Sequence, residues 1–593
     1  MSTQTIETFF TGKTLVIPSY QRDYAWTERN VDDLFDDVDE AIEVGGSHYL
    51  GTFILSQQDR NALVHVVDGQ QRLTTLTILM DALIDSVGDE GIKQHYRNTF
   101  IHHPVTGAKF RVLGSNEAFF RDLLEEKNPK PESDGQERML SAYRWIRQRV
   151  TALGNKGGQE LIKQWLLCIS QMEVLQFIEP NEGKAIRMFQ SVNDRGVPLA
   201  KMDIVKSLLV YYSNRYLNGE LDTFISEQFG EAFRNFSRIK RLAGEPGYKI
   251  RQIDRSAFSE DDVLRYHYLA FNGATFGMTV GDFWATSEGV LDSFLKPGLK
   301  ELRSDTMRLR AFIESYTSDL TRFFGAFEEL IQATRNDKQA YQLWVIQDLS
   351  ATLYPLVIRL HLQGWLQQHC ADDPRTLMEI VEMTDLRVFK LRGTNPQADI
   401  FRTTRDLHQY NADWVAQRLM GFCDWGMPDA MMASRLTDED MYRNPALQRM
   451  LLEEEAQARS RVGEPDLSLV ELADLNRDGL TVEHILPQDP DNSFNTVPYE
   501  FETSDEYLQH VHRLGNLVLL EGSINSACNN HAVESKISQP NLYLKSSLSA
   551  VKAVAAACAD NSRFSKSRLI ARSQSLSNLV VKHWPIRRSL SKP

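Results

Sequence analysis

The sequence predicts an α+β multidomain protein, and three features support this fold class. The chain has 593 residues, enough for two to four domains with sizeable cores. Residues 1–215 alternate short β-like runs with helical stretches, whereas residues 216–429 are mainly amphipathic and helical in pattern. Residues 430–593 contain a strand, a loop and a helix that carry conspicuous polar side chains. We therefore expect an N-terminal α/β domain, a mainly helical connecting domain and a C-terminal domain at these bounds.

The expected elements follow from local periodicity and chain breaks. In the first domain we expect strands at residues 15–18, 49–57, 64–68 and 174–179, and helices at 31–44, 73–86 and 202–214. Beyond residue 215, the amphipathic segments 302–334 and 341–368 each predict a long helix. Gly426-Met427-Pro428 predicts a break, and an acidic helix is expected over residues 446–458.

The composition is that of a globular protein from a reducing compartment. Hydrophobic residues make up 42% of the chain and charged residues 25%. The five cysteines are scattered without a CxxC pair, which argues against a disulfide framework or a zinc ribbon. The start MSTQTIETFF lacks the order of a secretory signal, and no apolar run approaches the roughly 18 residues of a membrane span. We expect a cytoplasmic protein without a membrane partner.

Three polar segments of the first domain predict an anion-binding pocket. They read IPSYQRDYAW from Ile17, VVDGQQRLTT from Val66 and FQSVNDRGVPL from Phe189. In the second segment a buried strand ends at Asp-Gly and a helix begins, so free helix amides and Arg72 would bind phosphate. Gly69 would let the backbone approach that phosphate closely. A Gly-Gln-Gln-Arg turn alone could simply cap a helix, but three such segments in one domain favour a nucleotide or phosphate pocket.

The run TVEHILP from Thr481, followed by LGNLVLL from Leu514 and by Asn525, is the most informative part of the chain. A carboxylate beside a histidine can hold a divalent ion while the imidazole deprotonates water. An asparagine in the loop would fix the ring, and the following helix would supply another metal ligand. An oxygen-rich site with one histidine favours Mg²⁺ or Mn²⁺ over zinc. This order of residues predicts a one-metal phosphodiesterase, although a strand-end histidine paired with Glu483 is the structural alternative.

The charge distribution leaves nucleic-acid binding open. The net charge of -14 counts weakly against a protein that coats DNA, but the potential in a groove follows local charge. Residues 563–593 contain basic side chains and no acid, and residues 234–255 are also strongly basic. Each tract is either a solvated face or a phosphate contact. The C-terminal tract follows the TVEHILP motif, which favours phosphate contact.

These motifs together resemble the GmrSD family of type IV restriction enzymes. The N-terminal segments, with FQSVNDRGVPLAKMDIVKS, resemble the GmrS-type domain, which is related to the ParB/sulfiredoxin-like nucleotide-handling fold. The segment from VEHILPQ to Lys536 resembles the GmrD-type His-Asn-His (ββα-metal) nuclease domain. With both on one chain, the protein resembles a fused GmrSD enzyme and is similar to BREX-associated BrxU proteins. The resemblance covers roughly residues 1–215 and 430–560, and the helical middle carries no assignable motif.

The resemblance implies an endonuclease that cuts double-stranded DNA carrying hydroxymethylated or glucosylated cytosines, in defence against phage. It also implies that binding and hydrolysis of ATP or GTP in the N-terminal domain stimulate cutting. The residues expected to bind the nucleotide are Tyr20, Gln21, Arg22, Asp68, Gly69, Gln70, Gln71, Arg72, Asn193, Asp203 and Lys206. Oligomeric state stays open, although a homodimer would supply two active sites for a double-strand break.

The nuclease motif assigns a role to each of its polar residues. His484 is expected to be the general base, Glu483 a metal ligand and Asn516 the residue that orients His484. Asn525 stands where the wider His-Asn-His group commonly has its final histidine, which makes the ligand set less certain. We expect it to be catalytic and a metal ligand, with Asn530 and His531 as alternatives for that duty. Lys536 is expected to contact the scissile phosphate, and His510 and His512 to be surface or packing residues.

Two other classes of function remain open at this stage. The replacement of the last histidine by Asn525 also fits a nucleotide-controlled DNA-binding sensor with a degenerate nuclease site. A nonspecific or RNA-directed nuclease is the third option. No residue pattern locates a pocket for a modified base.

Overall fold

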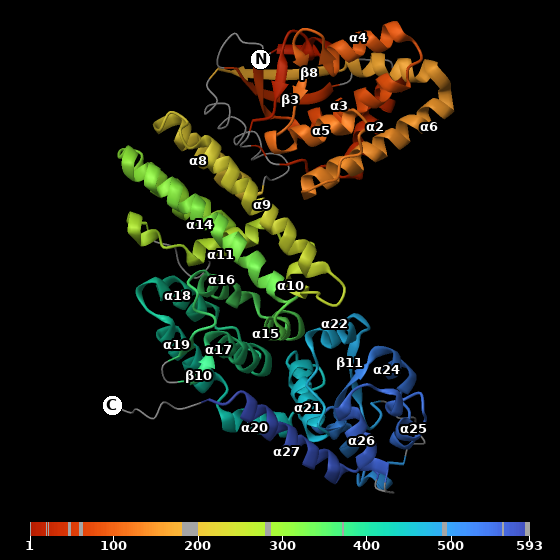
Figure 1. Ribbon diagram of the computed structural model, residues 1–593, viewed down its shortest axis with the longest axis vertical. Helices are drawn as coiled ribbons and strands as arrows, with labels where there is room; N and C mark the ends of the chain where they lie inside the picture. The colour runs from red at the N-terminus through yellow and green to blue at the C-terminus, as the bar shows by residue number, and fades with distance from the viewer. Residues whose placement is uncertain are drawn as a thin grey trace. The chain divides into compact units, whose positions relative to one another are not determined.

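The computed structural model describes residues 2–18, 21, 23–44, 49–57, 63–180, 200–278, 286–370, 373–488, 495–559 and 563–586. The chain divides into two compact units. The first comprises Met1–Ser237 with Ser287–Thr321, and the second comprises Arg238–Thr286 with Arg322–Pro593. The expected domain bounds near residues 215 and 430 therefore fall inside these units. The helices α9 (Asp222–Gly244) and α14 (Thr306–Ala333) each contribute residues to both units (Figure 1).

A six-stranded mixed sheet forms the centre of the N-terminal region, with the strand order β1-β8-β3-β4-β2-β7. Its strands are β1 (Ser2–Thr5), β2 (Thr14–Val16), β3 (Tyr49–Ser56), β4 (Leu63–Asp68), β7 (Phe110–Arg111) and β8 (Glu173–Glu179). The pairs β3–β8, β4–β2 and β2–β7 are parallel, and β1–β8 and β3–β4 are antiparallel. All four strands expected from the sequence are present, and the short strands β1 and β7 join them at the two edges.

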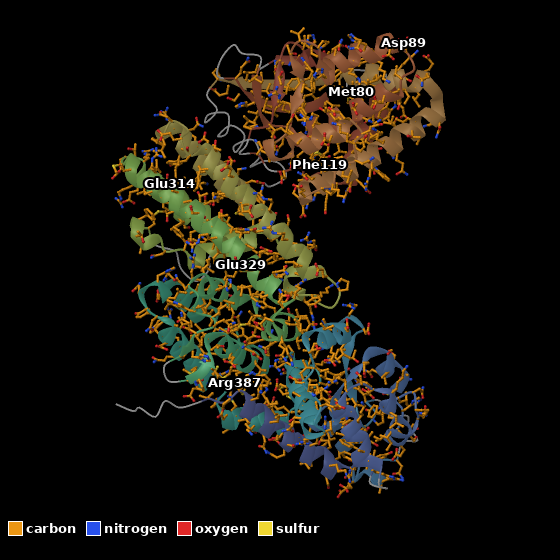
Figure 2. The ribbon with its side chains drawn as sticks, viewed as in Figure 1. Met80, Asp89, Phe119, Glu314, Glu329 and Arg387 are labelled. Carbon is orange, nitrogen blue, oxygen red and sulfur yellow. The ribbon has the colours of Figure 1, made fainter. Side chains whose placement is uncertain are left out.

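Three helices, α2 (Glu28–Val44), α3 (Gln70–Ser86) and α6 (Asp134–Gln171), pack in the core of this region (Figure 1). Helix α3 is buried around most of its circumference, as expected for an apolar helix between other layers. Met80 and Phe119, labelled in Figure 2, lie in this core. Smaller elements complete the region: α1 (Ile6–Phe10), α4 (Glu90–Phe100), α5 (Glu117–Leu124), β5 (His102–His103) and β6 (Gly107–Ala108).

Helices make up most of the middle of the chain, and one expected helix is broken. Helix α8 (Lys201–Tyr216) and α14 correspond to the helices expected at 202–214 and 302–334. The segment 341–368 is not one helix, because it divides into α15 (Lys338–Tyr341), a π-helical stretch Gln342–Ile346, and α16 (Tyr354–Leu362). The other helices here are α10 (Arg251–Asp254), α11 (Glu260–Ala270), α12 (Ser287–Gly289), α13 (Lys296–Leu302), α17 (Leu377–Thr384) and α18 (Gln397–Asp406).

The break in that segment has a local cause. Asp348 adopts φ +54°, a left-handed conformation that an α-helix cannot contain. Pro355 then occupies the first turn of α16, where its missing N–H costs nothing. An amphipathic pattern continues across both residues, so periodicity alone predicts one helix where the backbone forms separate helical segments.

A buried arginine fixes the end of the C-terminal helix within the second unit. Arg387 is fully buried, and its guanidinium donates to the carbonyl of Trp584 at 2.9 Å and to that of Met427 at 2.6 Å. It also pairs with Asp429 at 2.5 Å (Figure 2 labels Arg387). The expected break at residues 426–428 lies here, between α19 (Ala412–Gly426) and α20 (Asp429–Asp438). The arginine thereby joins this break to the end of α27 (Lys566–His583).

The C-terminal part of the second unit centres on the antiparallel pair β11 (Leu480–His484) and β12 (Leu517–Glu521). Helix α21 (Leu447–Arg461) is the expected acidic helix. The surrounding helices are α22 (Leu469–Arg477), α23 (Ser504–His510), α24 (Gly522–Cys528), α25 (Val533–Ser538), α26 (Ser549–Ala559) and α27. Within the described ranges, no helix combines the length and the apolar character that crossing a bilayer requires.

Candidate functional site

The second polar segment forms a strand-to-helix turn, and the first residues of the helix, Gln70 and Gln71, are buried. Strand β4 ends at Asp68, and α3 begins at Gln70. Gly69 has φ +95°, and a Cβ there would lie 2.2 Å from the Phe53 ring, so both conformation and space require glycine. In the described structure no side chain caps the start of α3. The first amides of the helix therefore remain available for an anion.

Two expected nucleotide-binding glutamines instead tie the first segment to the second. Gln21 donates to the carbonyl of Val67 at 2.6 Å. Gln71 accepts from the backbone N–H of Ala25 at 2.7 Å and donates to the carbonyl of Asp23 at 3.0 Å. Because these amide groups are already bonded to backbone, their observed role is to hold residues 21–25 against the β4–α3 turn.

The helix that follows the third segment, α8, reaches the same place through Lys206. This buried side chain donates to the carbonyl of Gln21 at 3.2 Å. Burial lowers the pKa of Lys206 to about 8, and the nearby Asp203 carboxylate opposes that shift. Parts of the first two polar segments and the start of α8 are therefore close in space, and residues 189–199 of the third segment lie outside the described residues. Tyr20, Arg22 and Asn193, also expected in the pocket, lie outside the described residues.

Arg72 and Gln70 are the members of this group best placed to meet a ligand. Arg72 is half-buried, with its guanidinium over the Phe53 ring and so close to Gly51 that a Cβ there would lie 2.4 Å from it. Burial lowers the pKa of Arg72, and Asp68 acts in the opposite direction. In the described part of the chain, the buried Oε1 atom of Gln70 has no hydrogen-bond partner. This acceptor could take a hydrogen bond from a ligand, although other buried polar atoms of the described residues also lack a partner.

His484, the expected general base, lies in a small aromatic cluster at the end of β11. Its Nε2 atom is 3.0 Å from Nδ1 of His512, so one ring donates to the other. The Tyr442 ring lies 4.3 Å from the His484 ring and stacks on His512 at 5.3 Å. His512 therefore contacts His484. The sequence predicts that His512 is a surface or packing residue and does not indicate this contact. The hairpin register could have indicated this, because His484 pairs with Leu517, shortly after His512.

The environment of His484 keeps its imidazole neutral. Burial, the largest cause, together with the nearby His512 and Lys536 lowers the pKa of His484 to about 3. The ring is only 5% exposed, so water solvates its charged form poorly. At neutral pH the ring can accept a proton, although it is a weak base in this state.

This shift predicts acid sensitivity of the folded second unit. The folded pKa of about 3 lies below the unfolded value of 6.5, so between these values the unfolded chain binds more protons. The contribution of His484 to stability is therefore complete above pH 6.5 and lost as pH falls toward 3. Stability of the parent should fall by about 1.4 kcal/mol per pH unit more steeply than that of His484→Gln. Hydrogen exchange of the β12 amides at pH 4.5–6.5 measures this, and parallel slopes would contradict it.

Glu483 and Lys536 form a buried ion pair on the other side of the strand. Lys536 Nζ lies 2.7 Å from Glu483 Oε1 and donates to the carbonyl of His484 at 2.7 Å. Neighbouring residues of a strand point to opposite faces, which explains why Glu483 and His484 contact different groups. Lys536 is fully buried, so this arrangement differs from the expected contact with a scissile phosphate.

The side chains as placed do not form a metal centre. Across the described ranges, no three His, Cys, Asp or Glu side chains gather in a way that could hold an ion. The carboxylate of Glu483 is occupied by the ammonium of Lys536. Asn530 and His531 are exposed in the turn between α24 and α25. The expected Mg²⁺ or Mn²⁺ site therefore does not fit this arrangement, because the ammonium stands where the carboxylate would meet a cation.

Asn516 braces the loop that follows His484. Its side chain accepts from the N–H of Leu486 at 2.8 Å and donates to the carbonyl of Val511 at 2.7 Å. The residue is fully buried, and its described hydrogen bonds all go to backbone atoms rather than to the His484 ring. The asparagine therefore holds two loops together and fixes the backbone at the end of β11.

Asn525 joins helix α24 to the strand. Its Nδ2 atom donates to Thr481 Oγ1 at 2.8 Å and lies 3.4 Å from the carbonyl of Val482. Thr481 and Glu483 share one face of β11 because strand side chains alternate. Asn525 thus lies on the same face of β11 as Glu483, as it would have to if both bound one metal ion. Its side-chain amide, however, is hydrogen-bonded to Thr481.

Arg572 of α27 supports the Asn516 loop and was not singled out as a site residue from the sequence. Its Nη1 atom donates to the carbonyls of Gly515 and Leu517, each at 2.8 Å. A Cβ at Gly515 would lie 2.0 Å from the carbonyl of Leu569, so only glycine allows α27 to approach this loop. The basic tract at residues 563–572 thus belongs to a docked helix rather than a solvated tail.

Comparison with known families identifies both ends of the chain. The model of the GmrSD restriction endonuclease N-terminal domain matches residues 6–210. The model of the GmrSD restriction endonuclease C-terminal domain matches residues 427–579, which include both strands of the His484 hairpin. A search of curated proteins finds no match. The two matches together cover more than half of the chain, and the protein belongs to the GmrSD restriction endonuclease family.

Proposed function

We propose that this protein is a type IV restriction endonuclease that cuts double-stranded DNA carrying hydroxymethylated or glucosylated cytosines. The observation that carries the proposal is a neutral imidazole, His484, at the end of β11 in the region matched by the C-terminal family model. The loop after it is held by Asn516, in the order expected for a His-Asn-His nuclease. A role in defence against phage with modified genomes follows from this substrate.

In the proposed reaction, His484 takes a proton from water while the water oxygen attacks phosphorus. The bond from phosphorus to the leaving oxygen breaks, and that oxygen takes a proton from solvent. A base with a pKa of about 3 is poorly matched to neutral pH, so binding must change its surroundings. The negative charge of a phosphodiester beside the ring favours the imidazolium and raises that pKa. His512 and Asn516 position the ring and its backbone.

One cleavage panel tests this proposal directly. The full chain is incubated with hydroxymethylated, glucosylated and unmodified duplexes and with RNA, each with and without ATP or GTP. Parallel samples contain Mg²⁺, Mn²⁺ or a chelator, because dependence on a divalent ion is a separate proposal. We expect cleavage of modified duplexes only. Equal cleavage of unmodified DNA or RNA would point instead to a nonspecific nuclease.

A second function is favoured by the Glu483–Lys536 ion pair. Because this pair occupies the expected metal ligand, the protein could be a nucleotide-controlled sensor that binds modified DNA without cutting it. Salt-sensitive binding without nicking in any metal would support the sensor.

We also propose that the N-terminal region binds and hydrolyses a nucleoside triphosphate at the start of α3, and that this stimulates cutting. The helix amides and the Arg72 guanidinium support a phosphate site there, and the Oε1 atom of Gln70 would accept a hydrogen bond from a hydroxyl or N–H group of the nucleoside. Arg72→Ala removes a charge-assisted contact of about 1.5–3 kcal/mol, so nucleotide binding should weaken roughly tenfold to hundredfold. Titration calorimetry measures this against Arg144→Ala, an exposed arginine of α6. Equal affinities of both variants would refute the site.

A further inference from the structure

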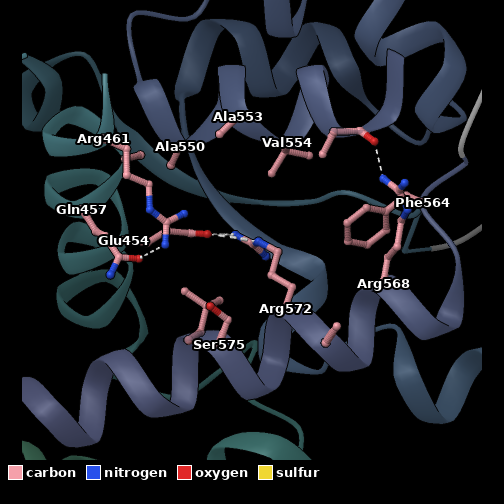
Figure 3. A pocket seen from close by; sticks show the side chains of 14 residues that line it. Glu454, Gln457, Arg461, Ala550, Ala553, Val554, Phe564, Arg568, Arg572 and Ser575 are labelled. Atoms are coloured by element: carbon pink, nitrogen blue, oxygen red, sulfur yellow. Dashed lines mark hydrogen bonds and ion pairs between the residues drawn. The ribbon is translucent and has the colours of Figure 1, made fainter. Parts of the chain in front are cut away.

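A basic cavity lies between α21, α26 and α27, beside the nuclease-like hairpin within the second unit. Its volume is about 370 Å³, and alanines from all three helices form much of its wall (Figure 3). Three guanidiniums line it, those of Arg461, Arg568 and Arg572, against the single carboxylate of Glu454. Arg568 and Arg572 belong to the basic C-terminal tract for which the sequence favours phosphate contact, whereas Arg461 was not singled out.

The positive charge of the cavity is only partly neutralised. Arg572 holds Glu454 through three side-chain hydrogen bonds, from Nη2 to Oε2 at 2.6 Å and to Oε1 at 2.7 Å, and from Nε to Oε1 at 3.0 Å. Arg461 donates to the amide oxygen of Gln457 at 2.8 Å, and Arg568 donates to the carbonyl of Ala557 (Figure 3). Both acceptors are neutral. Glu454 is the single carboxylate among the residues that line the cavity, and its ion pair is with Arg572.

We propose that this cavity binds backbone phosphates of DNA, one through Arg461 and one through Arg568, an inference that rests on the proposed function. A guanidinium fork matches the oxygens of a phosphate in two contacts, which makes arginine suited to this ligand. The alanine walls let a sugar-phosphate chain approach closely. Val554, Phe564 and Leu576 are the larger apolar residues of the wall, so the three guanidiniums rather than apolar surface favour a phosphate ligand.

The cavity is joined to the candidate nuclease centre through Arg572. The same guanidinium that lines the cavity donates to the carbonyls on both sides of Asn516. Asn516 in turn holds the N–H of Leu486, two residues after His484. A phosphate bound in the cavity therefore places DNA against a helix that directly supports the cleavage loop.

Salt-dependent binding by the full chain tests the proposal. Fluorescence anisotropy with a labelled modified duplex gives the slope of log affinity against log salt for each variant. Each lost phosphate contact lowers that slope by about 0.9. We expect this reduction in Arg461→Ala and in Arg568→Ala, and about twice that reduction in the double variant. Arg477→Ala is the control, because this exposed arginine of α22 does not line the cavity.

Further measurements separate this inference from the proposed function. Arg461→Glu adds repulsion at an exposed position, so weaker binding with unchanged thermal unfolding would support a contact even if Arg568→Ala misfolds. If the parent binds and cuts DNA but the slopes do not change, the cavity proposal is wrong and the nuclease proposal stands. Altered slopes in a protein that never cuts would leave the phosphate site and remove the nuclease. Loss of ATP or GTP binding in Arg568→Ala with an unchanged slope would assign the cavity to a nucleotide and overturn the inference.

Discussion

Replacing His484 with alanine is expected to lower the rate of cleavage of modified DNA by roughly 10²–10⁴-fold, the usual contribution of a general base. The ring is neutral, lies at the end of β11, and contacts His512 and Tyr442. Near His484, Asn516 and Lys536 bind backbone atoms and the Glu483 carboxylate rather than the His484 ring, so the alanine variant should keep the strand end in place. Single-turnover cleavage with saturating protein separates this loss of chemistry from a loss of binding.

A matched histidine variant gives this experiment its control. His531 is exposed in the turn after α24, and His531→Ala should cleave at the parental rate unless it replaces Asn525 in the site. His512→Ala should give an intermediate loss, because it removes the partner of His484 Nε2 without removing the base. Parental activity in His484→Ala, with DNA binding intact, would eliminate the proposed mechanism.

The sequence predicted correctly those strands that a short local pattern of residues determines. The strand 64–68 is a short β-branched run that ends at Asp68-Gly69, and it appears as β4 (Leu63–Asp68). The segment 341–368 was predicted wrongly, because amphipathic periodicity does not register the left-handed backbone at Asp348. The compact units also combine distant residues, so three consecutive ranges cannot describe them.

In the candidate nuclease centre, too, the sequence shows the order of the residues but not the contacts that the tertiary fold creates. The order of His484, Asn516 and Asn525 is visible in the sequence because each residue follows a recognisable strand or loop. The sequence interpretation assigned Glu483 and His484 to one metal centre, although adjacent residues on a strand point to opposite faces. That alternation was available from the sequence. The pairing of Glu483 with Lys536 was not, because only tertiary packing brings α25 to the strand.

Replacing Lys536 with methionine is expected to destabilise the second unit by about 3–5 kcal/mol, since it leaves a buried carboxylate without its partner. The ammonium binds Glu483 Oε1 at 2.7 Å and the carbonyl of His484 at 2.7 Å, so the variant loses both contacts. Methionine keeps most of the side-chain volume, which limits any additional cost from a cavity. Hydrogen exchange of the β12 amides measures the loss, because β12 pairs with β11 along its full length.

The double variant Glu483→Leu with Lys536→Met separates the stability of this pair from its part in the reaction. Removing both charges should restore most of the lost stability, because an apolar pair avoids the cost of desolvating two ions. If Glu483 is also a metal ligand, the restored protein stays folded but cleaves poorly. Parental cleavage by the double variant would mean that Glu483 serves only to hold Lys536. A double variant no more stable than Lys536→Met would show instead that the carbonyl contacts of the ammonium, not the ion pair, hold the end of β11.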